Sequence, residues 1–295
     1  VYSRFMEIRR VSLGISALLI AASLFFLATR GLNLGIDFTG GLILQVEFSK
    51  ATEVARVREI LAQAGQSQAT IQAYSDQGIL VRFAANDDAT QKTVVQALRT
   101  EDGAMKLLRM DKVGPVVGKQ LREEALLALA VSLAGILLYI TLRFQFRFAV
   151  VSVLALLHDA IITLGVFSLL QREIGVYFIA AILTIVGYSL NDTIVVLDRV
   201  RENWGGLSKG IAPLLDDSIN QTLSRTVNTS LTTLLAVVAL LVWGGPVIQD
   251  FSVAMFVGIL VGTYSSIYVA GALLCEWYER APRHPAYPGR IWTFR

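Results

Sequence analysis

Asp192 is a carboxylic acid inside the apolar run Val176 to Leu197, which is long enough to cross a bilayer. An ionisable group in hydrocarbon costs roughly 2.5 to 3.5 kcal/mol on insertion scales, so such a residue normally faces a bundle interior, a partner charge or a water path. Its polar neighbours supply hydroxyls and an amide that could hold water beside the carboxylate: Tyr188, Ser189, Asn191 and Thr193. This pattern indicates proton or ion handling at Asp192.

A second acid, Asp159, follows His158 near the centre of the apolar run Phe148 to Leu170. At 1.5 Å per residue, Asp159 lies roughly 16 Å from the arginine-flanked end of its run, and Asp192 lies roughly 9 Å from the corresponding end of its own. Two interpretations stay open. Asp159 is either a structural acid bonded to hydroxyls of a neighbouring helix or part of a proton path.

The fifth apolar segment, roughly Leu223 to Trp243, carries polar residues in its first half. They recur at i, i+4, i+7 and i+11, which places them on one stripe of a helix: Gln221, Arg225, Asn228 and Thr232. Because polar side chains avoid lipid, the spacing predicts that this stripe faces inward.

The composition is that of a membrane protein. The chain has 295 residues, of which 54% are hydrophobic and only 17% are charged, and its mean hydropathy is +0.58; soluble domains carry about 25% charged residues. The net charge of +3 comes from cations beside apolar segments, which is typical of topology signals and not of a nucleic-acid surface. One cysteine, Cys275, and two distant histidines predict no internal disulfide, no structural metal site and no cofactor.

Six segments are long enough to span the roughly 30 Å of a bilayer core. They are Val11 to Thr29, Ala125 to Leu142, Phe148 to Leu170, Val176 to Leu197, roughly Leu223 to Trp243, and Phe251 to Leu274. The arginines and lysines of the short connections fall on one side, and the other side's short loops hold only Arg172. By the positive-inside rule both termini are predicted to be cytoplasmic, and the long stretch after the first span is predicted to be outside. The start at Val1 shows no cleavable signal, so the first segment is expected to stay in the membrane.

The sixth segment carries a small side chain at every fourth position. This ridge predicts close packing against another helix: Ala254, Gly258, Gly262, Ser266 and Ala270.

The outside stretch alternates strand and helix periods in the order βαββαβ, which predicts an α+β, ferredoxin-like domain. The strands are expected near Leu42 to Phe48, Ala69 to Tyr74, Ile79 to Phe83 and Met105 to Asp111, and the helices at Glu53 to Ala64 and Thr90 to Arg99, capped by Asp87 or Asp88. No catalytic cluster is visible there, so binding or a mechanical role is expected. The predicted domains are residues 1–30, 31–120, 121–275 and 276–295.

Three stretches together resemble the SecF family, the smaller of the SecD and SecF protein-export proteins within the resistance-nodulation-division superfamily. The first follows the first span and is Gly35 Ile36 Asp37 Phe38 Thr39 Gly40 Gly41. The second runs from Val186 through Gly187, Tyr188, Asn191, Asp192, Asp198 and Arg199 to Asn203, and the third is Gly244 Gly245 Pro246. The loop Trp204 to Pro213 departs from the family, because only Lys209 is basic there.

The resemblance implies a non-enzymatic motor of the bacterial inner membrane that uses the proton gradient to assist preprotein export. The implied partners are SecD, the SecYEG translocon and the unfolded preprotein on the outer side. In that family an aspartate of the fourth span and an arginine of the fifth carry proton coupling, and the matching positions are Asp192 and Arg225. Motion of Arg225 relative to Asp192 would change the proton affinity of the acid. Asp198, at the motif's end, is expected to be a solvated acid paired with arginines. The first and second spans are expected to pass motion to the outside domain.

Three other functions account for part of this sequence. Two acids on adjacent helices suit an intramembrane aspartyl protease, but the Gly-x-Gly-Asp signature of that class is absent. Half of a proton-coupled drug or lipid pump would use the same buried acids for proton coupling but carry a different substrate. Gly14, Ala17 and Ala21 are small and form a possible packing surface for its second half. A purely structural subunit leaves Asp192 and Arg225 unexplained.

Overall fold

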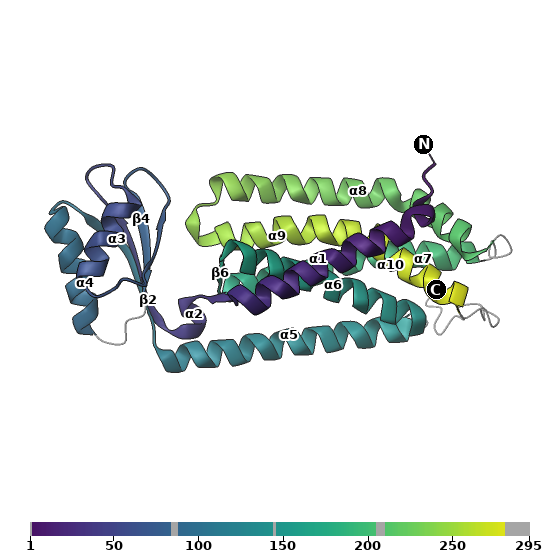
Figure 1. Ribbon diagram of the computed structural model, residues 1–295, viewed down its shortest axis with the longest axis horizontal. Coiled ribbons are helices and arrows are strands. Elements are labelled where there is room, and N and C mark those ends of the chain that lie inside the picture. Colours follow the sequence, from purple (N-terminus) through teal and green to yellow (C-terminus); the bar gives the residue numbers. More distant parts are fainter. Residues whose placement is uncertain (1, 84–87, 144–145, 205–209, 281–295) are drawn as a thin grey trace, which may run out of the picture.

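The computed structural model describes residues 2–83, 88–143, 146–204 and 210–280. The features predicted for Asp87, Lys209, His284 and the tail arginines from residue 283 onward lie outside these ranges. Figure 1 shows a long bundle of helices with a smaller sheet-containing unit at one end. Within the described ranges, six helical stretches are long and apolar enough to cross a membrane, so the prediction of a polytopic membrane protein is confirmed.

The six spans match the predicted apolar runs and extend beyond most of them. They are α1 (Arg9–Arg30), preceded by the 3-10 turn η1 (Phe5–Ile8), α5 (Pro115–Arg143), α6 (Phe146–Leu170), α7 (Val176–Glu202), α8 (Ile211–Trp243), and α9 (Pro246–Tyr264) continued through the π-helical turn η3 (Ser265–Val269) into α10 (Ala270–Arg280). The largest extension is in α8, which begins 12 residues before the expected start at Leu223. Its first turns are amphipathic and bury Ile211, Leu214 and Leu215.

Helices α6, α7 and α9 form the centre of the bundle, and α1, α5 and α8 lie around them. In α6, 56% of the most apolar stretch is buried, whereas in α5 the share is only 6%. Figure 1 shows α5 and α8 at opposite edges of the bundle. The first turns of α1 and the end of α10 both lie at the end of the bundle farthest from the sheet.

The ridge of small residues on the sixth span packs as predicted. Its five members are all buried. A side-chain carbon added at Gly258 would meet Ile185 of α7, and one added at Gly262 would lie 3.0 Å from the Cβ atom of Ser189. The absence of a side chain at these glycines therefore lets α9 approach α7 closely.

The unit at the end of the bundle has the predicted element order. It consists of β2 (Gly41–Glu47), α3 (Val54–Gln63), β3 (Thr70–Ala73), β4 (Gly78–Phe83), α4 (Asp88–Glu101) and β5 (Lys106–Val113). The strands form an antiparallel sheet in the order β3-β4-β2-β5. Alternate residues of β2, including Leu42, Leu44 and Val46, are buried in a core with Val57, Leu61, Val94 and Leu98 of α3 and α4.

A short connection joins this unit to the bundle. After α1 the chain forms β1 (Asn33–Leu34), which pairs in parallel with β6 (Glu173–Ile174) between α6 and α7, and then the single turn α2 (Ile36–Thr39). Helix α2 packs on the start of α5, where a side-chain carbon at Gly118 would lie 3.0 Å from the backbone nitrogen of Gly40. The entry to the unit and the exit from it therefore lie side by side.

Candidate functional site

Asp192 lies on α7 at its seam with α8 and α9. The residue is buried, with only 2% of its surface exposed. The Ser230 hydroxyl of α8 lies 3.5 Å from Asp192 Oδ2, at the outer limit of a hydrogen bond. Ser230 Oγ is in turn 2.7 Å from Thr263 Oγ1 of α9. The acid therefore lies inside the bundle beside hydroxyls of α8 and α9. The predicted polar neighbours on its own helix do not surround it, because Ser189 bonds Asp159 and Thr193 bonds Ser266.

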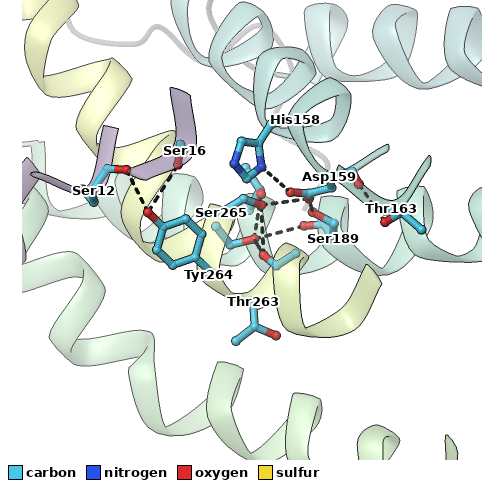
Figure 2. Close-up of polar contacts among 12 residues, drawn as sticks. Ser12, Ser16, His158, Asp159, Thr163, Ser189, Thr263, Tyr264 and Ser265 are labelled. Atoms are coloured by element: carbon cyan, nitrogen blue, oxygen red, sulfur yellow. Dashed lines mark hydrogen bonds and ion pairs between the residues drawn. The ribbon is translucent and has the colours of Figure 1, made fainter. Parts of the chain in front are cut away.

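Asp159 lies on α6 and receives three strong contacts. Ser189 of α7 donates to Asp159 Oδ2 at 2.5 Å, and Ser265 donates to the same oxygen at 2.8 Å. His158 Nδ1 lies 2.9 Å from Asp159 Oδ1. Figure 2 shows these groups converging on one carboxylate from α6, α7 and the π-helical turn. These are the bonds of a structural acid to neighbouring hydroxyls, and a place for Asp159 in a proton path remains a prediction.

The π-helical turn η3 aims two consecutive serines at different helices. Ser265 reaches Asp159 of α6, and Ser266 Oγ lies 3.0 Å from Thr193 Oγ1 of α7. A π-helical turn is rare and often occurs at functional sites. The turn was not predicted, because the small-residue spacing of this span is compatible with an uninterrupted α-helix. The polar pair Ser265 Ser266 inside an apolar span was the available signal.

The predicted inward stripe on α8 is wrong. Its four residues, Gln221, Arg225, Asn228 and Thr232, are all exposed on the surface of this chain. The buried stripe runs beside it through Thr222, Thr226 and Ser230. Short hydroxyl side chains fit against α7 and α9 and can bond their own helix, as Thr222 does to the Ser218 carbonyl, whereas the longer amide and guanidinium groups do not fit there. Within the described part of the chain, no ion pair joins Arg225 to Asp192.

The remaining motif residues of α7 lie apart from the acids. Asn191 and Gly187 are on the exposed side of the helix, and the hydroxyl of half-buried Tyr188 has no hydrogen-bond partner among the described residues. Asp198 pairs with Arg201 at 2.8 Å and Arg143 at 3.6 Å, which confirms the expected acid paired with arginines. Arg199 pairs with Glu202.

The first motif lies at the opposite end of α7 from Asp198. The Val176 amide, the first of α7, donates to Asp37 Oδ2 at 2.9 Å. Phe38 is buried in the bundle's apolar core, and Thr39 Oγ1 bonds the Gly35 carbonyl. Gly40 and Gly41 have positive φ angles of 77° and 153°, and a side-chain carbon at Gly41 would lie 2.7 Å from the Phe83 carbonyl oxygen. Both glycines are therefore required by the turn into β2.

These features define a class of protein: a polytopic membrane protein with a sheet-containing unit at one end of its helical bundle. The family model described as "Protein export membrane protein SecD/SecF, C-terminal" matches residues 93–280, and the "SecD/SecF GG Motif" model matches residues 25–52.

Curated relatives narrow the class. The chain is 48% identical to the protein translocase subunit SecF of Vibrio alginolyticus, over 91% of this chain and 88% of that protein. It is 43% identical to the subunit of the same name from Pseudomonas aeruginosa, over 92% and 90% of the two chains. The chain belongs to the SecF family of protein translocase subunits, with a role in Sec protein translocation, and a drug or lipid pump is not favoured.

Solved structures agree with this fold. The crystal structure of SecDF from Thermus thermophilus, described as a translocon-associated membrane protein, is 43% identical and superposes with a TM-score of 0.87. The match covers 95% of this chain and 39% of the SecDF chain. A second structure, of SecDF in a super-membrane-facing form, gives a TM-score of 0.73 at 42% identity.

Proposed function

We propose that the chain is one half of a proton-driven export motor in the bacterial inner membrane, working with SecD and the SecYEG translocon on unfolded preprotein. Asp192 binds and releases the driving proton, and Arg225 modulates it. The sheet-containing unit is a ferredoxin-like domain on the outer side of the membrane, and both termini are cytoplasmic.

One observation carries the proposal: Asp192 is buried between three membrane helices and makes no ion pair in the described structure. An ionised carboxylate in such a place is costly, and weak hydroxyl contacts offset little of that cost. Binding a proton removes the charge. The proton affinity of Asp192 is therefore sensitive to any cation or water that approaches it.

The exposed polar stripe of α8 supports a second membrane subunit. Arg225, Gln221 and Asn228 lie on a spanning helix whose most apolar stretch is only 17% buried. Such groups are costly against lipid, so they call for a polar partner surface. SecD is the natural occupant, since the related SecDF chain is more than twice as long as the part this chain matches. A partner that moves along this stripe would alter the field of Arg225 at Asp192.

The orientation follows from charge and from the position of the helix ends. Arg9 and Arg10 open α1, and Arg280 closes α10, at the bundle end remote from the sheet. Cations mark the cytoplasmic side. The sheet-containing unit then lies outside, where emerging preprotein would be found.

The test compares two carboxylate-to-amide changes on the same helix. Asp192→Asn keeps the size of the side chain but cannot ionise, whereas Glu202→Gln alters a half-exposed acid at the helix end. Membrane vesicles with SecD and the translocon would be assayed for preprotein export with and without a proton gradient. The Asp192→Asn variant is expected to assemble and to lose the gradient-dependent stimulation, and the Glu202→Gln variant is expected to retain it. Full stimulation in the Asp192→Asn variant would exclude proton coupling at this residue.

A further inference from the structure

The outer end of α7 is capped by a residue from the entry to the sheet-containing unit. Helix α7 begins after Gly175, which has no side chain to satisfy the first amides of the helix. Asp37, 139 positions earlier in the chain, accepts the Val176 amide at 2.9 Å. A carboxylate at this position also interacts favourably with the positive end of the helix dipole. The GG motif and the helix of Asp192 are therefore in direct contact.

Two glycines make this contact possible. A side-chain carbon at Gly175 would lie 2.5 Å from Asp37 Oδ2, and one at Gly35 would lie 2.5 Å from Glu173 Oε1. The Gly35 amide also donates to the Ile174 carbonyl at 2.9 Å, which continues the pairing of β1 with β6. A larger residue at Gly175 would displace the Asp37 carboxylate from the Val176 amide, and one at Gly35 would displace the Glu173 side chain.

The sheet itself contacts the same four-residue segment, Glu173–Val176. Arg82 of β4 pairs with Glu173 at 2.6 Å, with side chains only 12% and 15% exposed. Burial raises the pKa of the Glu173 carboxyl, and the Arg82 guanidinium opposes this rise. Glu173 lies three residues before the first residue of α7, so the ion pair joins the middle of the sheet to that helix.

These polar contacts join two bodies that do not share an apolar core. The buried apolar residues of the bundle and of the sheet-containing unit form two separate clusters. Between them lies a cavity of about 280 Å³ whose lining combines charged groups, among them Asp37, Arg82, Asp111 and Glu173, with apolar side chains such as Leu80 and Phe178. A few directional contacts across a cavity allow the unit to tilt with a neighbouring helix, whereas a continuous apolar core would hold it still.

We propose that the outer end of α7 is the point at which motion enters the outer domain: Asp37 and the Arg82–Glu173 ion pair make the domain follow α7. This inference rests on the proposed function, in which Asp192, 16 positions along the same helix, changes its charge. It adds a route to the one expected through the first and second spans. A rigid helix passes an axial shift or rotation from Asp192 to Val176 over roughly 24 Å.

The test measures the position of the domain relative to the bundle. Spin labels are placed at Asp76→Cys on the sheet unit and Trp243→Cys at the end of α8, both exposed positions, in a Cys275→Ser background. The full chain, in complex with SecD in a membrane, is measured by pulsed electron resonance. The distance distribution is expected to differ between Asp192 and its Asp192→Asn variant, which mimics the protonated acid.

Capping variants then decide whether the difference depends on the contact. With Asp37→Ala, the difference between the two distributions is expected to shrink, because one of the two contacts is lost. With Asp37→Ala combined with Arg82→Glu, the two distributions are expected to coincide, because the domain no longer follows α7. Asp37→Asn retains an acceptor oxygen and is expected to preserve the difference. Asp111→Ala is the matched control, since Asp111 lines the same cavity and pairs with Arg109 instead of α7. Exchange of the ion pair, Arg82→Glu with Glu173→Arg, is expected to restore what Arg82→Glu alone removes.

Two outcomes overturn the inference. One is a distance that does not depend on residue 192; the other is a dependence that survives Asp37→Ala combined with Arg82→Glu. Both can occur while Asp192→Asn still abolishes gradient-dependent export, so failure of this inference is distinguishable from failure of the proposed function. If the Asp192→Asn variant exports normally, the labels still report whether the domain follows α7 through Asp37.

Discussion

Asp159 and Asp192 are both buried acids on membrane helices, and their surroundings separate them. Asp159 accepts from two serines and contacts a histidine at distances of 2.5 to 2.9 Å. Asp192 has one long contact with a hydroxyl. A carboxylate with three good donors is held in place, whereas one with weak partners can change its charge without breaking a network.

This contrast predicts different costs for the same substitution. Asp159→Asn keeps one acceptor oxygen and replaces the other with an NH₂ group, which cannot accept a hydrogen bond. Buried donors therefore lose their partners. A loss of about 1–3 kcal/mol of stability is expected, measured as a lowered thermal unfolding midpoint of the purified protein in detergent. Asp192→Asn is expected to leave the midpoint nearly unchanged. A larger shift for Asp192→Asn than for Asp159→Asn would contradict this assignment.

At the level of elements, α1 and α6 approach each other through a single glycine. A side-chain carbon at Gly165 would lie 2.3 Å from the Ser23 Cβ and 2.6 Å from its Cα, so the backbone of α1 blocks it. Gly165→Ala is therefore expected to destabilise the bundle by about 1–3 kcal/mol. Gly14→Ala is the control, because a side-chain carbon there meets nothing within 4 Å. The thermal midpoints of the two variants give the comparison, and equal midpoints would refute the close contact.

The sixth span changes how the membrane topology should be tested. Cys275 is fully buried, so its protection from a thiol reagent would not report the side of the membrane. Arg280, at the end of α10, is exposed. In a Cys275→Ser background, Arg280→Cys is expected to resist a membrane-impermeant thiol reagent added outside intact cells, and Asp76→Cys is expected to react. The reverse pattern would invert the orientation.

The helices and the order of the sheet elements could be predicted from periodicity, because apolar runs and strand alternation are local properties of the chain. Which side of α8 faces the bundle could not be predicted in this way. Hydropathy identifies Arg225 and Asn228 as polar, but a polar stripe on a membrane helix is compatible with the interior of this chain or with a second subunit. The cap on α7 was also invisible, since Asp37 and Val176 are joined only by the fold.

At the scale of the whole molecule, the sheet-containing unit has its own apolar core and is expected to fold alone as residues 31–120. Val81 of β4 is fully buried in that core, so Val81→Asp places a charge there and should abolish cooperative thermal unfolding of the isolated unit. A mutant that still unfolds cooperatively would contradict the observed register of β4.

The same unit is expected to lose stability in acid. Backbone and side-chain contacts of Ser49 hold the pKa of Asp102 below its ordinary value, and Lys112 does the same for Asp88. A carboxyl with a lowered pKa in the folded state contributes stability above its ordinary pKa, and the contribution is lost as the pH falls through the folded value. Asp102→Asn should therefore flatten the decline of the unfolding midpoint below pH 4. An unchanged acid profile would show that Asp102 plays no part in it.

The π-helical turn Ser265–Val269 contains one more residue than an α-helical turn, so it changes the direction in which the following side chains point. Each residue of an α-helix advances about 100° around its axis, so the turn resets which face of α10 points inward. Ala270, Leu274 and Tyr278 are buried in that phase. Removing one residue from the turn would restore an ordinary α-helix and rotate this face toward lipid. Glu276 and Glu279, which pair with Arg9, would rotate with it. The length of this segment is therefore as strongly constrained as its composition, and single-residue deletions there should be tolerated less well than substitutions.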